Sequence, residues 1–313
     1  MRKYLGKAVI IAFFVGIMFL FNIFTDGRFL RSNNVINILS HITVPVLMAC
    51  SLCFIVTAGR IDLSLGSILV LSSNIAAVLA LQLGYIGLFI GGLGSAVAFI
   101  TLNTLIEQRL KVPAWIAGLG MAMVYEGIAV IYLSSMVARG STVAALENVC
   151  RELGRFPTII IVCAVAILFA YIMFNYTSSG INIRAIGGNF RVSDMMGINL
   201  NKTGIISGIL GGVFMGFAAM VNISSANRII PTSGLTTLAT IFQPLAIYFL
   251  ANALSKWLNL ITGLVFSSIF VMSLFNFLTR KGIPSGTWQN IVLGLSIILF
   301  GILAMRGHKG VVK

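Results

Sequence analysis

Charged side chains are scarce in this sequence. Only 9% of the 313 residues are charged, and Asp and Glu together number 7, whereas 58% are hydrophobic. A soluble domain carries roughly 25% charged residues, which it needs to cover its surface with polar groups. The mean hydropathy of +1.04 agrees with this shortage. The composition therefore excludes a water-soluble globular protein and predicts an integral membrane protein.

The residues that usually carry catalysis or bind metals are also few. There are two histidines, His41 and His308, and four cysteines. Cys50 and Cys53 form a C-x-x-C pair inside an apolar run with no nearby histidine, so packing explains them better than zinc or redox chemistry. The sequence has no G-x-x-x-x-G-K-[ST] nucleotide motif and no Ser/His/Asp arrangement. We therefore expect no catalytic residues, no metal site, no cofactor and an energy source on another subunit.

The charges that are present are mostly basic, and the formal net charge is +14. In a membrane protein such an excess is better explained by loops that contact an anionic leaflet than by nucleic acid, so we expect the lipid bilayer, and no nucleic acid, as a partner. Placing the amino terminus inside puts 13 Lys and Arg on the inner side and 8 on the outer side. This bias predicts that both termini are cytoplasmic.

Long apolar runs recur along the whole chain. A helix needs about 20 apolar residues to cross the hydrocarbon core, and no alternating pattern of a β-barrel is present. We therefore predict an all-α polytopic membrane protein with about ten transmembrane helices, and expect a hairpin turn at 83–85. The candidate spans are 7–24, retained as a first helix, 35–58, 64–83, 86–106, 113–134, 157–175, 203–222, 236–254, 257–279 and 288–305.

Three connecting segments are long enough to have a role of their own. Residues 135–156 and 223–235 fall on the outer side, and a short amphipathic helix is expected over 141–153. Residues 176–202 fall on the inner side. Because this inner segment has the clearest helix start and stop signals, it is the best candidate for a contact outside the membrane.

The inner segment has the pattern of a short helix between two breaks. Gly187 and Gly188 end the preceding element, and Asn189 is a favourable N-cap for about two helical turns over 190–196. Gly197 then supplies a stop. Two interpretations remain open. The helix docks on a partner through its polar and methionine side chains, or it is a linker that rests on lipid headgroups.

Three polar residues fall inside predicted spans and are candidates for a solute pathway. Glu126 lies deep in its span, where an ionisable side chain is costly and therefore suggests a function. It either lines a translocation path or is a hydrogen-bonded structural glutamate. The span holds no second acid and no histidine, which argues against a proton relay. Asn74 and Asn103 are the other two candidates.

The stretch AGRIDLSLGS, residues 58–67, places an arginine and an aspartate between two apolar runs. Asp62 or Ser64 can N-cap the helix that follows, and an acid is favourable at that positive end. Arg60 is expected to pair with Asp62 or to reach headgroups. The segment is therefore a capped turn or a break at membrane depth, and breaks of the second kind tend to line a substrate path.

The same stretch resembles the G-G-I-D-L-S-V-G-S signature of the permease subunits of bacterial ABC sugar importers of the ribose, galactoside and xylose type. Four further segments are similar to motifs of that family in the same order, so the likeness covers residues 29 to about 240. These segments are FLRSNNVINIL at 29–39, NTLIEQRLKVPAWIAGLGMAMVYEGIAVIYLSS at 103–135, RAIGGNFRVSDMMGINLNKTGI at 184–205 and PTSG at 231–234.

The resemblance implies an ABC importer permease fold, with residues 1–313 as a single transmembrane domain in a bacterial inner membrane. It implies a second permease subunit, identical or different, an ABC ATPase and an extracytoplasmic solute-binding protein as partners. The solute would be a simple sugar or a similar small polar molecule. The 184–205 loop would be the cytoplasmic coupling helix that contacts the ATPase. The residues that the resemblance implicates there are Arg184, Gly187, Gly188, Asn189, Arg191, Asp194 and Gly197.

The chain also departs from the family pattern in three places. Arg60 stands where the signature has its second glycine, and 190–192 reads Phe-Arg-Val where the family has Pro/Glu-Ala-Ala. A glycine-rich run of the family is replaced by the glycine-poor 240–262 region. These departures suggest one divergent half of a heterodimeric permease. The rival hypotheses are an ion- or proton-coupled secondary transporter and a non-conducting partner half.

Overall fold

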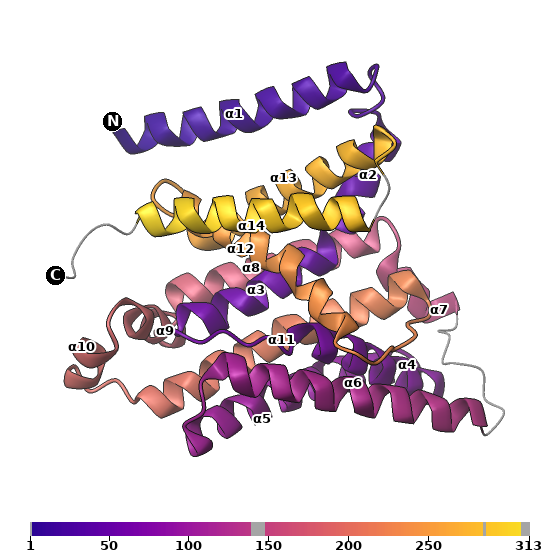
Figure 1. Cartoon of the computed structure of the whole chain (residues 1–313), viewed down its shortest axis with the longest axis vertical. Helices are drawn as coiled ribbons and strands as arrows, with labels where there is room; N and C mark the ends of the chain where they lie inside the picture. The colour runs from indigo at the N-terminus through magenta and orange to yellow at the C-terminus, as the bar shows by residue number, and fades with distance from the viewer. Residues whose placement is uncertain (1, 139–147, 284–285, 308–313) are drawn as a thin grey trace. The chain divides into compact units, whose positions relative to one another are not determined.

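The structure is a computed structural model that describes residues 2–138, 148–283 and 286–307, and it contains no strand within these ranges (Figure 1). The helical elements follow the apolar runs of the sequence. They are α1 (Arg2–Phe24), α2 (Ser32–His41), α3 (Thr43–Thr57), α4 (Leu65–Phe89), the π-helix η1 (Ile90–Gly94), α5 (Ser95–Leu110), α6 (Ala114–Ala138), α7 (Asn148–Arg151), the 3-10 helix η2 (Glu152–Gly154), α8 (Thr158–Tyr176), α9 (Ser178–Gly188), α10 (Phe190–Met195), α11 (Leu200–Ala226), the 3-10 helix η3 (Thr236–Leu238), α12 (Ala239–Leu254), α13 (Leu260–Arg280) and α14 (Thr287–Gly307).

Eight helical stretches among the described residues are long and apolar enough to cross a membrane, which confirms the all-α polytopic prediction. The expected number of ten was approximate. The first expected span corresponds to a shorter apolar helix at Ile10–Phe24, and two others fall within one stretch of 46 residues, Leu65–Leu110.

The stretch Leu65–Leu110 folds back on itself, as expected for a hairpin. Gly84 has φ 59° and ψ −137°, which breaks the helix at a conformation that glycine adopts without strain. The two arms then lie in contact. A Cβ atom on Gly87 would lie 2.0 Å from the Leu79 carbonyl oxygen, and one on Gly91 would lie 2.7 Å from Ala76 Cα. The predicted turn at 83–85 is therefore confirmed.

The chain forms two compact units. The first unit comprises residues 1–46 and 242–313, and the second comprises 47–241. In the first unit α1, α2 and α13 share an apolar core around Phe29, Ile38 and Ile42. Phe21 stacks on Phe277 there, with ring centroids 4.5 Å apart.

Helix α11 is the central helix of the second unit and packs along α4 and α5. Its glycines allow the close approach. A Cβ atom on Gly212 would lie 2.6 Å from Val97 Cα, and one on Gly216 would lie 2.6 Å from Leu93 Cα. Small residues spaced in this way are the usual contact surface between transmembrane helices. The packing of α11 fixes the elements that form the polar clusters described below.

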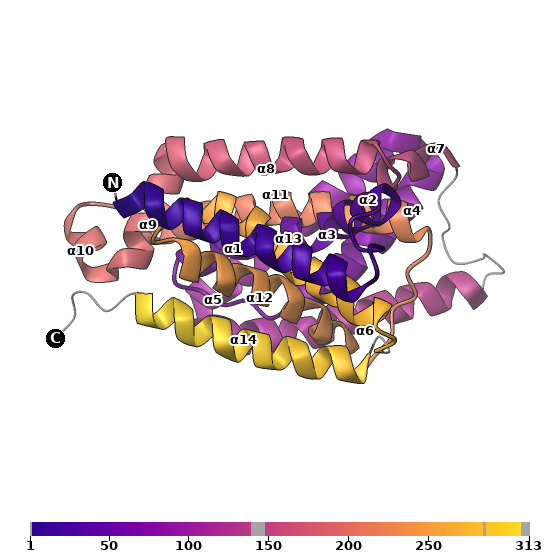
Figure 2. The same ribbon diagram turned by 90° about the horizontal axis from the view of Figure 1, so that it is seen from above.

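Helices α9 and α10 lie at one end of α8, and α7 lies at the other end (Figure 2). The Asn189 side chain accepts a hydrogen bond from Val192 N at 3.1 Å, which caps α10 as predicted. Gly197 has φ +80° and ends the turn after the helix, also as predicted. Of the expected outer loop 135–156, residues 139–147 lie outside the described part of the chain, and 148–154 are helical.

Candidate functional site

The break between α3 and α4, residues 58–64, is built around a buried aspartate. Asp62 Oδ1 accepts hydrogen bonds from Ser64 N at 2.8 Å and from Ser64 Oγ at 2.7 Å. Ser64 occupies the N-cap position of α4, but the capping interaction comes from Asp62. A carboxylate at this place also complements the positive end of the helix. The predicted capping is thus seen only in part, because Asp62 binds the backbone N–H of Ser64 at the start of α4 whereas the Ser64 side chain makes no capping hydrogen bond.

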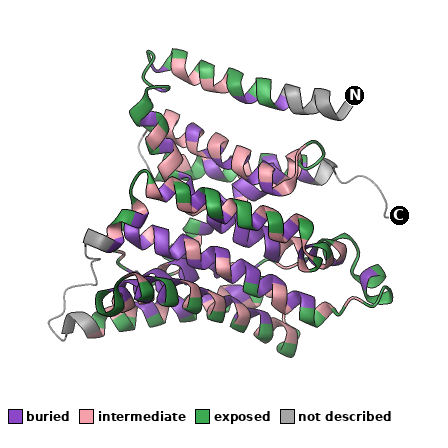
Figure 3. Cartoon of the chain, turned by 180° about the vertical axis from the view of Figure 1, so that it is seen from behind, coloured by how far each residue is buried: buried purple, intermediate pink, exposed green. Residues whose placement is uncertain are grey.

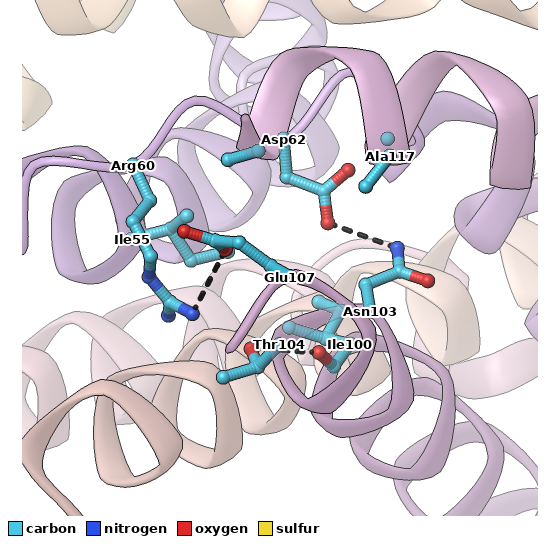
Figure 4. Close-up of a pocket in the computed structure, with 10 residues that line it drawn as sticks. Ile55, Arg60, Asp62, Ile100, Asn103, Thr104, Glu107 and Ala117 are labelled. Carbon is cyan, nitrogen blue, oxygen red and sulfur yellow. Dashed lines mark hydrogen bonds and ion pairs between the residues drawn. The ribbon is translucent and has the colours of Figure 1, made fainter. Parts of the chain in front are cut away.

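Asn103, from α5, links this break to α6 (Figure 4). Its Nδ2 donates to Asp62 Oδ2 at 3.0 Å and to Ser64 Oγ at 2.6 Å. Its Oδ1 accepts from the Tyr125 hydroxyl at 2.7 Å. All four side chains are buried. Buried amides that use both ends in this way fix the relative positions of the elements that carry them.

Arg60 contacts other partners than the sequence suggested. It forms an ion pair with Glu107 of α5, with Nη1 and Oε2 3.3 Å apart, and the two side chains are only 11% and 21% exposed. Its Nη2 donates to Gly204 O at 2.9 Å and to Ser207 Oγ at 2.7 Å. The expectation of a pair with Asp62 or with headgroups is wrong. The reason is that Asp62 is already bound by Ser64 and Asn103, whereas the packing of α5 and α11 brings Glu107 and Ser207 to the guanidinium.

The residues around this ion pair leave very little space. The cavity beside Arg60 and Asp62 has a volume of about 10 Å³. A single water molecule needs roughly that much, so a sugar does not fit. Burial lowers the pKa of the Arg60 guanidinium, and the charge of Glu107 opposes this shift. The Arg60 cluster, which we define as Arg60, Asp62, Ser64, Asn103, Glu107, Tyr125 and Ser207, therefore joins α3–α4, α5, α6 and α11 rather than holding a solute.

Glu126 forms a second buried polar site, in which its carboxyl group contacts the backbone at the start of η3, directly before α12. Its Oε1 accepts from Thr237 N at 2.8 Å and from Thr237 Oγ1 at 2.5 Å, and its Oε2 accepts from Leu235 N at 2.7 Å. Thr237 Oγ1 also lies 2.7 Å from Ser67 Oγ of α4. Glu126 lies twelve residues into α6, which is about 18 Å along the helix. A carboxylate deep in one span thus caps the start of another helix, which favours the structural interpretation of Glu126.

Asn74 is separate from both sites. It is buried, and its Nδ2 donates to Val70 O of its own helix at 2.8 Å.

The residues expected in the 184–205 loop lie on α9, α10 and the turn after them. Sequence reasoning did not identify Glu107, Tyr125, Ser207 or Thr237 as members of these sites. Only Glu107 carried a usable signal, because it is a rare acid one helical turn beyond Asn103.

Comparison with known proteins settles the family. The model of the family described as branched-chain amino acid transport system, permease component, matches residues 34–301. The chain belongs to this permease family. The matched region contains the Arg60 cluster, Glu126 and all of α10. Together with its apolar helices, this membership makes the chain a multi-pass membrane permease protein.

Several curated relatives of this permease are similar over most of their length. The ribose import permease protein RbsC of Escherichia coli (strain K12) is 28% identical over 278 residues, which cover 87% of this chain and 85% of the relative. RbsC of Bacillus subtilis is 26% identical, covering 90% and 87%. The xylose transport system permease protein XylH of Escherichia coli (strain K12) is 22% identical, covering 93% and 89%. No solved structure matches the chain.

Proposed function

We propose that this chain is the membrane-spanning permease subunit of an ATP-driven importer for a simple sugar or a similar small polar solute. The observation that carries the proposal is the family match over residues 34–301, together with relatives named for ribose import and for xylose transport that match over 85% and 89% of their length. Both units together form one permease domain in a bacterial inner membrane, with both termini cytoplasmic. A second permease subunit, identical or divergent, completes the pathway, and an extracytoplasmic solute-binding protein delivers the solute.

An ATPase subunit docks on α10 in this proposal. The helix is capped at its start, and most of its side chains are exposed (Figure 3). We define the docking surface as Phe190, Arg191, Val192, Asp194, Met195 and Met196, of which Met195 and Met196 are 85% and 74% exposed. Ser193 is buried and faces the protein. Flexible methionines and two opposite charges are well suited to a groove on another protein.

The route from the docking surface to the Arg60 cluster is short. Helix α11 begins five residues after α10 ends, and its first two turns carry Gly204 and Ser207, which bind Arg60. Gly187 of α9 also packs directly on Thr57 at the end of α3, since a Cβ atom there would lie 1.8 Å from the Thr57 carbonyl oxygen. A displacement of α10 by the ATPase would therefore act on the break between α3 and α4 from two sides.

Charge reversal on the docking surface tests this proposal. We expect Arg191→Glu together with Asp194→Lys to weaken association with the co-expressed ATPase by about tenfold or more, because two complementary contacts become like-charge contacts. Association is measured by titrating purified ATPase against the permease in nanodiscs. Arg228→Glu is the control, because it changes an exposed charge in the 223–235 segment, which is expected on the outer side of the membrane. Equal affinity for the wild type and the double variant would remove α10 as the docking site.

The rival mechanisms predict different transport behaviour. A secondary transporter would take up solute without any ATPase and would stop when an uncoupler collapses the ion gradient. Unchanged uptake after separate replacement of Asn74, Asn103 and Glu126 would favour a non-conducting half. Recovery of the native complex without an ATPase in mild detergent would contradict the importer proposal itself. The solute class is tested with ribose, xylose and leucine, since the family description names branched-chain amino acids.

A further inference from the structure

Helix α2, which forms the first ten residues of the candidate span Ser32–Thr57, has one distinctly polar face. This face carries three polar residues at intervals of four and three positions, Asn33, Asn37 and Ser40, which places them on one side of the helix. Both asparagines are exposed. The opposite face carries Ile38, which is buried in the core around Phe29. In a chain that is 58% hydrophobic, a polar face on a spanning helix indicates contact with water, a solute or another polar surface.

This face forms one wall of an open groove. The groove has a volume of about 500 Å³ and is lined by Asn33, Asn34, Ile36, Asn37, Ser40 and Arg280. All of the lining residues belong to the first unit. The groove is therefore a property of α2 and α13 themselves.

The floor of the groove is fixed by a hydrogen-bond network. Asn34 is buried, and its Oδ1 accepts from Arg280 Nη2 at 2.5 Å and from Arg280 Nε at 3.1 Å. Asn276 Nδ2 donates to the same oxygen at 3.1 Å, and Asn34 Nδ2 donates to Phe29 O at 2.7 Å. These bonds hold the Asn34 amide and the Arg280 guanidinium in one orientation. A preorganised polar floor of this kind lowers the entropic cost of binding a ligand.

We propose that this groove binds a neutral polyhydroxylated solute, and the proposal rests on the importer function given above. The exposed amides of Asn33 and Asn37 supply donors and acceptors, and the Ser40 hydroxyl, which donates to Ile36 O, supplies an acceptor, a pattern that vicinal hydroxyl groups satisfy. None of the described lining residues is acidic, so the groove offers no counter-charge for the ammonium group of an amino acid, and its cation Arg280 already donates to Asn34 and Asn276. In the proposed orientation the groove lies at the outer end of α2 and α13, where an arriving solute first meets the permease.

Cysteine labelling tests the groove without using transport. The four native cysteines are buried, so an Asn37→Cys variant of the full complex in nanodiscs can be labelled with a membrane-impermeant maleimide. We expect labelling to slow as ribose, xylose or fructose is added, by about elevenfold at a sugar concentration ten times the dissociation constant. Asn290→Cys, an exposed position on α14 outside the groove, is the control and should label at a constant rate.

Three results would overturn the proposal. They are no labelling of Asn37→Cys, labelling that no sugar slows, and protection by leucine without protection by any sugar. An Asn33→Leu/Asn37→Leu variant adds an uptake measurement, in which we expect the KM for the protecting sugar to rise about tenfold or more as amide hydrogen bonds are lost. If this variant instead weakens only the binding protein's affinity while sugar protection is absent, the groove is a protein contact and the proposal fails.

The two proposals fail separately. Sugar protection in a complex that lacks any ATPase would support the groove and contradict the ATP-driven importer. ATP-dependent sugar uptake by the wild type, without sugar protection at Asn37→Cys, would support the importer and contradict the groove.

Discussion

Replacing Glu126 with alanine is expected to lower the free energy of unfolding by about 3 kcal/mol, since three hydrogen bonds disappear and two of their donors belong to the buried Thr237. The donors are Leu235 N, Thr237 N and Thr237 Oγ1. Without the carboxylate, the first turn of η3 and α12 loses its cap inside the second unit. Unfolding in a mixed-micelle denaturant series gives this free energy, and uptake should fall with it.

Two further variants test whether the effect comes from the two acceptor oxygens of the Glu126 side chain. Glu126→Gln keeps one acceptor oxygen, while its NH2 group takes the place of the other and cannot accept, so this variant should lose roughly half as much stability as the alanine variant. Glu152→Ala removes an exposed acid and should change stability by less than about 0.5 kcal/mol. If Glu126→Ala is as stable as the wild type but transport is lost, Glu126 belongs to the solute path and not to the helix cap.

Removing the partner of Arg60 is the second large effect. Glu107→Ala is expected to destabilise the protein by about 3–5 kcal/mol, because it leaves a guanidinium that is only 11% exposed without its counter-charge. The same denaturation measurement applies. Arg60→Ala leaves a more exposed carboxylate, and it also releases Gly204 O and Ser207 Oγ of α11. We therefore expect Arg60→Ala to reduce the solute imported per ATP hydrolysed more than its loss of stability explains.

The double variant Arg60→Ala/Glu107→Ala completes a double-mutant cycle, which measures the coupling free energy between the two residues. Residues that interact directly show coupling of about 0.5–3 kcal/mol, so the double variant should be more stable than the sum of the two single losses allows. Asn74→Ala affects a hydrogen bond within α4 alone and should be additive with either variant. Additivity of Arg60 and Glu107 would show that the ion pair contributes no stability, and Arg60 would then contribute only through its hydrogen bonds to Gly204 O and Ser207 Oγ of α11.

Local features of this protein could be predicted from the sequence because short-range chemistry decides them. The shortage of charge fixes the membrane environment. The apolar runs locate the spans but not their number, since ten were expected and eight helical stretches of the described residues are long enough to cross a membrane. The turn at Gly84 follows from one glycine between two apolar runs, and α10 follows from Asn189 and Gly197, which lie within eight residues of each other. In each case the residues that determine the structure are neighbours in the chain.

The partners of the buried charges could not be predicted in this way. Arg60 meets Glu107 and Ser207 across 47 and 147 residues, and Glu126 meets Thr237 across 111. The sequence alone does not show which of several polar groups a charged side chain contacts. It therefore suggested Asp62 as the partner of Arg60 and left two possible roles for Glu126. The close packing of α4, α5, α6 and α11 selects one partner for each.

The sequence by itself therefore determined the membrane environment of this protein, its helical class and local features such as the turn at Gly84 and the cap of α10. Tertiary structure alone decided which carboxylate pairs with Arg60, which helix Glu126 caps and which residues of α2 and α13 share a groove. The physical reason is that burial makes an unpaired polar group costly, and only the packed arrangement of helices shows which groups lie close enough to satisfy it.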